Sequence, residues 1–261
     1  MDMGTNIPIT LRKEMYKALI FDLDGTAIPN EPNGMPTDNL IEVIKQLRGR
    51  MKVCVATGRP LFNSLPIIQR LGLTDPCIIS GGTQIVDPTT KKILWGKDME
   101  IFQVEAIMKI ASQYPYPVFF GDDEVSELAK KKVVKEPERI IYIEPVNRED
   151  AEDILAKLNR IPDIAAYKVM SWTPDHFDIH ITHAEATKRH ALEVLLKILD
   201  IHKDNIVTAG DGNNDLPLFE ISKYKIAMGN GSDELKKKAD FIAPSVTNDG
   251  LAIALRKLFL N

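Results

Sequence analysis

A short apolar run that ends in two carboxylates constrains the fold of this chain more than any other stretch. Ala18–Phe21 shows no alternation of polar residues, which is typical of a strand buried on both faces of a parallel sheet. Asp22 and Asp24 follow directly, and Gly25 permits a tight turn after the strand. Open α/β sheets bind ligands at the carboxyl ends of their strands, so the motif predicts a site at that edge.

The closeness of these two carboxylates indicates a bound cation. Two acids held one residue apart repel each other and raise each other's proton affinity unless a cation lies between them. Oxygen ligands suit a hard divalent cation, and Mg²⁺ is the one we expect. An isolated Asp-x-Asp pair is equally compatible with solvated acids at the end of a strand, so the rest of the chain has to decide.

Length and composition exclude several classes of protein. A chain of 261 residues exceeds the usual size of one core and predicts two domains. The net charge is −4 and the lysine runs at 130–132 and 236–238 are short, so nucleic acid is not an expected partner. Residues 1–14 lack the apolar core of a signal peptide and no stretch is apolar enough to span a membrane, so we expect a soluble cytoplasmic protein. Cys54 and Cys77 lie in apolar runs and are expected to be buried free thiols, which leaves no zinc site.

A second strand also ends in polar residues. The apolar run at 51–56 is followed by Thr57 and Gly58, and then by a helix that starts after Pro60. A hydroxyl, a glycine amide and a helix N-terminus together can bind an anion. By themselves, these residues are equally compatible with an ordinary turn between a strand and a helix.

The middle of the chain has a different pattern. Two short strands around a turn at 87–90 predict a hairpin, which belongs to antiparallel structure. We expect further strands at 118–121, 139–144, 165–171 and 177–182, with helices at 101–112, 125–134 and 147–158. Such a set predicts a sheet with helices on one face. We therefore expect an α/β protein in which a doubly wound, Rossmann-like parallel-sheet core (1–82 and 187–261) contains an inserted α/β cap domain (83–186).

The first pattern resumes with a helix that starts near Thr187. Lys188 lies at the start of its apolar stripe, whereas Arg189 belongs to the solvent face. A lysine in the first turn opposes the helix dipole, and on the inward side it also loses hydration, so it needs an anion. A lysine that extends to the surface is the alternative interpretation.

Acidic and amide residues recur at the end of a later strand. The apolar run at 205–209 ends in Gly210, and Asp211, Asn214 and Asp215 follow. The glycines here superficially suggest a dinucleotide-binding loop, but Asp215 replaces the third glycine and acids would repel a pyrophosphate. We expect edge strands at 225–228 and 240–243 and a closing helix at 249–260, and we expect a helix over Asp38–Arg48 capped by Thr37.

Taken together, these motifs resemble the haloacid dehalogenase (HAD) superfamily, specifically the Cof-type, sugar-phosphatase-like hydrolases with a C2B-type α/β cap. The matching motifs are Asp22-Leu23-Asp24-Gly25-Thr26, Thr57-Gly58-Arg59, Lys188 and Gly210-Asp211-Gly212-Asn213-Asn214-Asp215. The resemblance implies that Asp22 is the nucleophile and a metal ligand, and that Asp24 is the acid/base and a ligand through its backbone carbonyl. It further implies that Asp211 binds Mg²⁺ and that Asp215 contacts the metal ligands without binding the metal itself. The implied phosphate binders are Thr57, Gly58, Lys188 and Asn214.

Two departures from the family pattern do not touch this chemistry. Related hydrolases often have Asn-Gly-Ala where this chain has Gly81-Gly82-Thr83, which weakens any role for an amide side chain there. They often have a glycine at the position of Arg189, which we expect to face solvent.

The expected activity is hydrolysis of a small phosphomonoester, such as a sugar phosphate or related metabolite, through an aspartyl phosphate with Mg²⁺ as cofactor. A phosphomutase with the same aspartyl chemistry is the alternative. A receiver-like signalling domain is a more distant one, because it needs neither an acid/base at Asp24 nor an inserted domain. His176, His180 and His183 are interpreted as ordinary strand and loop histidines, because no cysteine or tight carboxylate cluster lies near them in the sequence. Neither the oligomeric state nor the identity of the metabolite follows from the sequence.

Overall fold

The chain folds into two compact units. The computed structural model describes residues 15–121, 126–127 and 137–260. The first unit comprises Met1–Ala56, Ile67–Cys77 and Leu195–Asn261, and the second comprises Thr57–Pro66 and Ile78–Val194. Among the predicted site residues, Thr57, Gly58 and Lys188 therefore belong to the second unit, and the acidic ones to the first. The predicted boundaries of a core and a cap domain stay a prediction.

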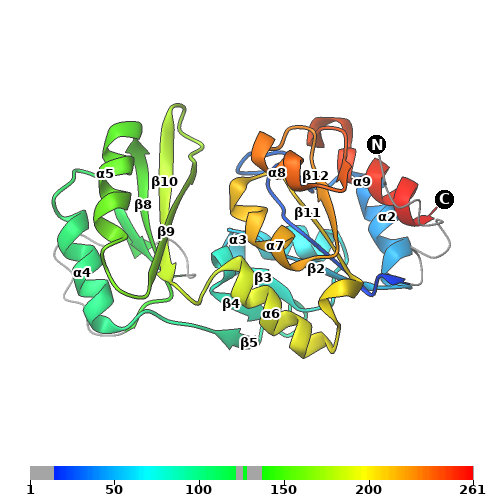
Figure 1. The fold of residues 1–261 in the computed structure, drawn as a ribbon, viewed down its shortest axis with the longest axis horizontal. Coiled ribbons are helices and arrows are strands. Elements are labelled where there is room, and N and C mark those ends of the chain that lie inside the picture. Colours follow the sequence, from blue (N-terminus) through cyan, green and yellow to red (C-terminus); the bar gives the residue numbers. More distant parts are fainter. Residues whose placement is uncertain (1–14, 122–125, 128–136, 261) are drawn as a thin grey trace. The chain divides into compact units, whose positions relative to one another are not determined.

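A parallel sheet forms the centre of the first unit (Figure 1). Its strands are β1 (Ala18–Phe21), β2 (Lys52–Val55), β11 (Ile206–Gly210), β12 (Tyr224–Ala227) and β13 (Phe241–Ile242). The order is β13-β12-β11-β1-β2, and every pairing is parallel. Because β2 lies on one side of β1 and the later strands lie on the other, the sheet is doubly wound, which confirms the predicted fold class.

Helices cover both faces of this sheet, since every residue of β1 is wholly buried. The helices that belong wholly or partly to this unit are α2 (Asp38–Arg48), α3 (Leu61–Arg70), α6 (Lys188–Leu199), α7 (Leu216–Ile221), α8 (Asp233–Lys238) and α9 (Gly250–Leu255). The bounds of α2 agree with the prediction, and the Thr37 hydroxyl accepts the predicted capping hydrogen bond from the Leu40 N–H at 3.1 Å. Cys54 and Cys77 are buried free thiols, as expected.

One expectation about the core sheet is wrong. Both 225–228 and 240–243 were expected to form edge strands, yet β12 lies inside the sheet and, of these two strands, only β13 is at an edge. The reason is that β13 consists of only Phe241 and Ile242 and still pairs in parallel with Ile226 and Ala227. A two-residue strand leaves almost no pattern in the sequence by which its neighbour could be recognised as central.

The rest of the chain builds two further sheets. A three-stranded sheet contains β3 (Cys77–Ile79), β4 (Gln84–Val86) and β5 (Ile93–Gly96), in that order. Strands β4 and β5 are the predicted hairpin, but β4 pairs with β3, so the hairpin belongs to this small sheet rather than opening the cap sheet as expected. The chain reverses after β3 because Ser80, Gly81 and Gly82 have φ values of 51°, 70° and 107°.

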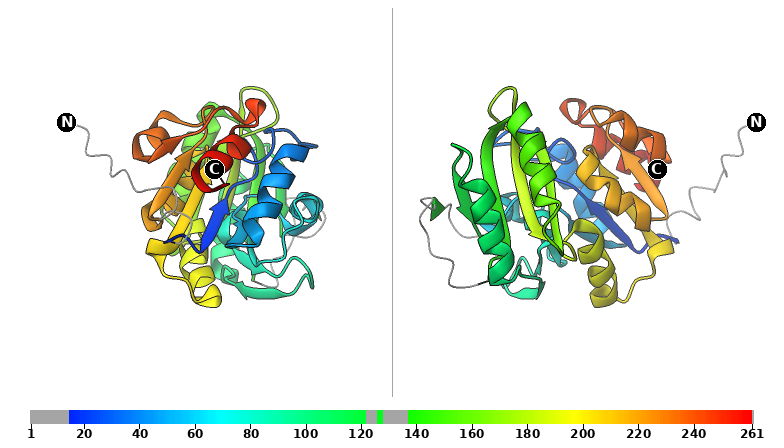
Figure 2. Two further views of the ribbon diagram at one scale, coloured as in Figure 1. Left: turned by 90° about the vertical axis from the view of Figure 1, so that its right-hand side faces the viewer. Right: turned by 60° about the vertical axis from the view of Figure 1, so that its left-hand side comes forward.

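An antiparallel sheet with helices on one face dominates the second unit, as predicted. It contains β6 (Val118–Phe120), β7 (Ser126–Glu127), β8 (Ile140–Asn147), β9 (Ile164–Met170) and β10 (His176–His183), in the order β7-β6-β8-β10-β9. Helices α4 (Ile101–Ala111) and α5 (Arg148–Leu158) pack on the same face, around Ile107, Ile141, Ile154 and Ile179 (Figure 2). The predicted helix at 125–134 lies outside the described residues, except for Ser126 and Glu127, which form β7. Within the described parts of the chain, no helix has the length and hydropathy to cross a membrane.

The other face of this sheet, which we call the helix-free face, is polar. It carries Tyr142 and Glu144 of β8, Tyr167 of β9, and Asp178 and His180 of β10, because alternate residues of a strand point to opposite faces. His180 lies opposite Tyr142 on one side and Tyr167 on the other. Burial, and next the neighbouring Asp178, raises the pKa of Glu144 to about 7. Burial also raises the pKa of Asp178.

The acid pair predicts a pH-dependent effect of Glu144→Gln. A raised pKa means that the folded protein holds this proton more tightly than the unfolded chain, so stability falls as pH rises from about 4.5 to about 7. The substitution should therefore stabilise the protein by about 1–2 kcal/mol more at pH 8 than at pH 5. Urea unfolding at both pH values measures this difference, with Glu105→Gln on the exposed side of α4 as the control. An equal effect at both values would show that the carboxyl group is not perturbed.

Candidate active site

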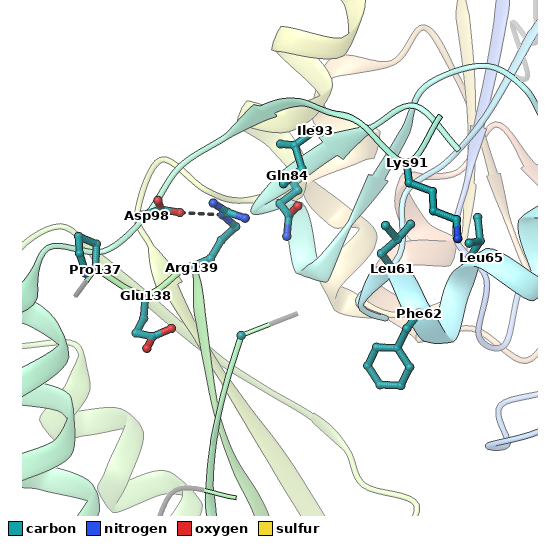
Figure 3. Close-up of a pocket in the computed structure, with 11 residues that line it drawn as sticks. Leu61, Phe62, Leu65, Gln84, Lys91, Ile93, Asp98, Pro137, Glu138 and Arg139 are labelled. Atoms are coloured by element: carbon teal, nitrogen blue, oxygen red, sulfur yellow. Dashed lines mark hydrogen bonds and ion pairs between the residues drawn. The ribbon is translucent and has the colours of Figure 1, made fainter. Parts of the chain in front are cut away.

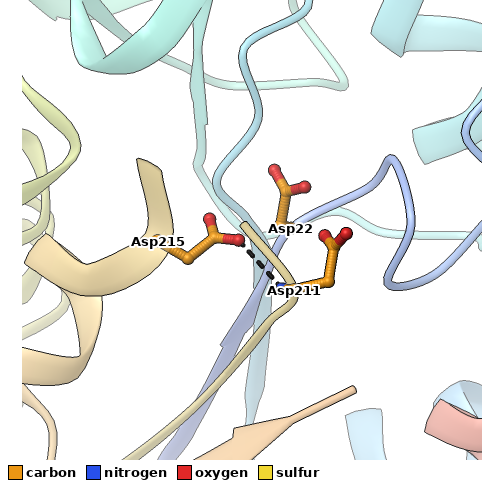
Figure 4. Close-up of side chains that lie close together, drawn as sticks. All are labelled: Asp22, Asp211 and Asp215. Atoms are coloured by element: carbon orange, nitrogen blue, oxygen red, sulfur yellow. Dashed lines mark hydrogen bonds between the residues drawn. The ribbon is translucent and has the colours of Figure 1, made fainter. Parts of the chain in front are cut away.

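Three carboxylates converge at the carboxyl edge of the parallel sheet. Asp22 follows β1 and Asp211 follows the neighbouring strand β11, and the Asp22 N–H donates to the Ala209 carbonyl at 3.0 Å. Asp22, Asp211 and Asp215 each place one carboxylate oxygen within 4.8 Å of the others (Figure 4). Asp22 is 5% exposed and Asp215 is fully buried, so their charges are poorly hydrated. The structure therefore brings together the acids of two sequence motifs that are almost 190 residues apart.

Asp215 holds the loop after β11 in place. Its Oδ2 accepts hydrogen bonds from the N–H groups of Asp211 and Gly212, both at 3.1 Å. A Cβ on Gly210 would lie 2.6 Å from the Cβ of Asp215, so glycine is required for this close approach. These contacts agree with the predicted supporting role of Asp215, although its carboxylate is also a member of the cluster.

The Asp211 carboxylate is positioned by the loop after β1. Gly25 has φ 74°, and a Cβ there would lie 2.2 Å from Asp211 Oδ2. The Thr26 hydroxyl donates to Asp211 Oδ1 at 3.1 Å. Asn230 donates through Nδ2 to the Gly25 carbonyl at 2.8 Å and to Asp211 Oδ2 at 3.5 Å. Sequence reasoning missed Asn230, because it belongs to no motif and meets this loop only in the folded chain.

The donor set of this cluster fits Mg²⁺. Three nearby carboxylates repel each other, and hard oxygen donors of this kind bind a hard divalent cation. Asp24 lies in the turn that closes between Leu23 and Ile28, and its side chain is not among the clustered carboxylates. That position is compatible with the predicted role of its backbone carbonyl as a ligand. The roles of the individual residues stay predictions.

Asn214 lies beside the cluster in the same loop. A Cβ on Gly212 would lie 2.2 Å from Asn214 Oδ1, so the glycine leaves room for this amide. Ser232 stabilises the loop, since its N–H donates to the Asp211 carbonyl at 2.8 Å and its hydroxyl to Asn213 Oδ1 at 2.6 Å. Asn214 is half-buried, and its contact with a phosphate group stays a prediction.

The remaining predicted site residues lie in the second unit. Thr57 is fully buried, its Oγ1 accepts from the Arg59 N–H at 3.1 Å, and its carbonyl accepts from the Gly81 N–H at 3.0 Å. Lys188 is 3% exposed in the first turn of α6, which confirms its predicted place on the buried face. A Cβ on Gly82 would lie 2.3 Å from the backbone nitrogen of Lys188, so the Ser80–Gly82 turn packs directly on the N-terminus of α6.

The two departures from the family pattern have different surroundings. Arg189 is half-exposed and its guanidinium lies 3.4 Å from Glu193, which confirms that this position faces solvent. Gly81 instead meets the second sheet, since a Cβ there would lie 2.2 Å from the Tyr167 hydroxyl. A larger residue at position 81 would therefore displace Tyr167.

The second unit also contains a pocket that none of the predicted site residues lines. Its volume is about 590 Å³, and Figure 3 shows the residues that line it. The lining residues are Leu61, Phe62, Leu65, Gln84, Lys91, Ile93, Asp98, Gly121, Pro137, Glu138 and Arg139. Arg139 and Asp98 form an ion pair at 2.7 Å within it. The pocket brings no nucleophile, acid/base pair or metal-binding cluster together, so we assign it no part in the chemistry.

Proteins of known structure share this fold. The sugar phosphatase BT4131 of HAD subclass IIB superimposes with a TM-score of 0.78 at 20% identity, covering 92% of this chain and 98% of that one. Among curated relatives, the phosphoglycolate phosphatase of Methanothermobacter thermautotrophicus is 25% identical over 92% of this chain and 98% of its own length. The putative phosphatase MG265 of Mycoplasma genitalium is 24% identical with the same coverage.

The family follows from a match over most of the chain. The profile of haloacid dehalogenase-like hydrolases matches residues 19–255, so the chain belongs to this family. The resemblance noted in the sequence is thereby confirmed, as is the expectation of an enzyme of the phosphatase type.

The close approach of Gly25 to Asp211 predicts that Gly25→Ala weakens metal binding without removing any ligand. The added methyl group would push the Asp211 carboxylate aside, and loss of such supporting contacts typically lowers metal affinity about 10–100-fold. Calorimetric titration with Mg²⁺ measures this change. Gly49→Ala is the matched control, because the nearest atom to a Cβ there is 3.9 Å away. Wild-type affinity in a folded Gly25→Ala protein would contradict the assigned position of Asp211.

Proposed function

We propose that this hydrolase is a Mg²⁺-dependent phosphatase that cleaves a small phosphomonoester, such as a sugar phosphate, through an aspartyl phosphate on Asp22. The observation that carries the proposal is the cluster of Asp22, Asp211 and Asp215 at the carboxyl edge of the parallel sheet. The buried free thiols Cys54 and Cys77 support a reducing compartment, the cytoplasm, as the place of action. We expect neither nucleic acid nor a membrane as partner.

In the first half of the proposed reaction, a carboxylate oxygen of Asp22 attacks the phosphorus atom. The bond between phosphorus and the leaving oxygen breaks, and Asp24 donates a proton to that oxygen. In the second half, Asp24 accepts a proton from a water molecule, whose oxygen attacks the same phosphorus atom. The bond to Asp22 then breaks and inorganic phosphate is released.

Charge neutralisation is the second requirement of phosphoryl transfer. Asp22, Asp211 and the Asp24 carbonyl would hold Mg²⁺, which when bound neutralises charge on the phosphoryl oxygens. We assign the Thr57 hydroxyl, the Gly58 amide, the Lys188 ammonium and the Asn214 amide to the phosphoryl oxygens, on the strength of the family motifs. The burial of Lys188 supports this assignment, because a desolvated ammonium needs an anion.

The inserted region supports a metabolite substrate. We propose that residues 1–82 and 187–261 form the catalytic core and that 83–186 form a cap that screens the leaving group. The fold is shared with a sugar phosphatase, whereas a curated relative is a phosphoglycolate phosphatase, so family membership alone leaves the leaving group open. A phosphomutase remains the alternative, and release of free phosphate without a bisphosphate activator would exclude it.

The nucleophile assignment predicts that Asp22→Asn abolishes turnover while the fold survives. The change removes the attacking carboxylate and a metal charge at almost constant volume, so kcat should fall by at least about a thousandfold. Phosphate release from an aryl phosphate measures activity, and circular dichroism checks the fold. Asp38→Asn, at an exposed carboxylate on α2, is the control. Residual activity near a tenth of wild type would rule out Asp22 as the nucleophile.

The acid/base assignment predicts a different result for Asp24→Asn. Only the backbone carbonyl of Asp24 is proposed to bind the metal, so Mg²⁺ affinity should stay within about threefold of wild type. Turnover should nevertheless fall about 100-fold or more, because the proton donor is lost. Parallel calorimetry and steady-state kinetics separate the two effects. A collapse of metal affinity would mean that the side chain itself is a ligand.

A further inference from the structure

The helix-free face of the antiparallel sheet lies against the turn that contains the predicted phosphate binder Gly58 and against the turn at 80–82. A Cβ on Gly58 would lie 3.9 Å from His180 Cε1. The Tyr167 hydroxyl occupies the space in front of Gly81, and the Arg59 guanidinium lies 5.7 Å from the ring centre of Trp172. These contacts place the side chains of β9 and β10 next to Gly58, inside one compact unit.

His180 Nδ1 and Asp178 Oδ1 are buried on this face, and neither atom has a hydrogen-bond partner among the residues that the structure describes. The two residues are separated by one position on β10, so their side chains lie on the same face about 7 Å apart. His176 and His183 differ, since their Nδ1 atoms lie 2.7 Å from the Pro174 carbonyl and 3.0 Å from the Glu185 N–H. Unpaired buried polar atoms destabilise a fold unless a ligand or water pairs with them, so they mark a place for one.

The charges on this face favour an uncharged ligand. Burial, and next the nearby Lys188, lowers the pKa of His180 to about 4, so its imidazole is neutral at physiological pH. Glu144 and Asp178 are neighbouring acids whose pKa values burial raises, so a further carboxylate beside them is disfavoured. The cations nearby are Arg59, which lies against Trp172, and Lys188, which the proposed function assigns to the phosphoryl group.

We propose that His180, Asp178 and Tyr167 form a subsite for the leaving group of the substrate, and that it takes an uncharged, hydroxyl-bearing group in preference to a carboxylate. The inference rests on the proposed phosphatase function and adds the class of leaving group. A neutral imidazole nitrogen and a carboxylate oxygen accept hydrogen bonds from hydroxyl groups, and the tyrosine hydroxyl both donates and accepts. A carboxylate on the leaving group would meet the negative charge of Asp178 and Glu144 instead.

The subsite also explains why glycine occupies position 81. The Tyr167 hydroxyl fills the space that a side chain at 81 would need, and the backbone there has φ 70°. The polar group in front of this turn is therefore supplied by β9 of the antiparallel sheet rather than by residue 81.

A pair of substrates that differ in one terminal group tests the preference. Glucitol phosphate ends in a hydroxymethyl group and phosphogluconate ends in a carboxylate, and the two are otherwise alike. We expect kcat/KM to be at least about tenfold higher for glucitol phosphate, because the acid pair repels the carboxylate. Equal values, or a preference for phosphogluconate, would overturn the proposal.

Variants locate the preference on this face. Asp178→Asn should lower the ratio of the two kcat/KM values at least about fivefold, mainly by improving phosphogluconate. His180→Phe should reduce kcat/KM for glucitol phosphate about tenfold more than for an aryl phosphate, which offers no hydroxyl group. Two substitutions outside the helix-free face are the controls. Asp175→Asn changes a carboxylate in the turn before β10, and Tyr116→Phe removes a hydroxyl that donates a hydrogen bond to Asp150. Variants that change both ratios no more than these controls would refute the subsite.

The phosphatase proposal and the subsite can fail separately. An aryl phosphate that is not hydrolysed would refute the phosphatase function, whatever the preference between the two sugar derivatives. Calorimetric binding of both compounds to the Asp22→Asn protein then decides the subsite without turnover. Tighter binding of glucitol phosphate, reduced by His180→Phe, supports the subsite, whereas equal binding of the two compounds refutes it.

Discussion

Electrostatic repulsion among three carboxylates at one sheet edge is the constraint on which the first unit depends. Two ionised groups 4.8 Å apart repel by about 3 kcal/mol at an effective dielectric constant near 20, so the cluster needs support. Two backbone N–H groups stabilise Asp215, while Thr26 and Asn230 donate to Asp211. Hydrogen bonds to charged groups contribute about 1.5–3 kcal/mol each, which is comparable to the repulsion. These hydrogen bonds from the surrounding chain thus hold the cluster in place.

In the second unit, close packing around glycines holds the predicted site residues in position. The turn at 80–82 passes through positive φ values and brings its backbone against both the start of α6 and the Tyr167 hydroxyl. Residues with side chains could adopt neither this backbone nor these approaches without strain. One turn therefore fixes the position of Lys188 relative to Thr57, because the Gly81 N–H of the turn donates a hydrogen bond to the Thr57 carbonyl. The same turn fixes both residues relative to the helix-free face.

The proposed division of labour between the acidic cluster and the helix-free face would explain how related enzymes differ in substrate. This chain shares its fold with a sugar phosphatase and about a quarter of its residues with a phosphoglycolate phosphatase, whose names imply leaving groups of different charge. The phosphoryl group is the same in every such substrate, so the acidic cluster has no reason to change. The leaving group is what differs, and the charges of Glu144 and Asp178 provide a physical basis for selecting it.

Local signals in the sequence determined much of this protein. Apolar runs and turn residues located β1 and the motif at Asp22, helical spacing and Thr37 defined α2, and the same spacing placed Lys188 on a buried face. These features depend on residues within a few positions of each other, so the sequence displays them directly. Strand pairing and contacts between distant side chains cannot be read from the sequence in this way. Only the tertiary structure decided four features: the hydrogen bond between Thr26 and Asp211, which are 185 residues apart, the pairing of β3 with the hairpin, the contacts of Asn230, and the nitrogen of His180 that has no partner among the described residues. The reason is that loop closure and packing of the whole chain decide which distant segments meet.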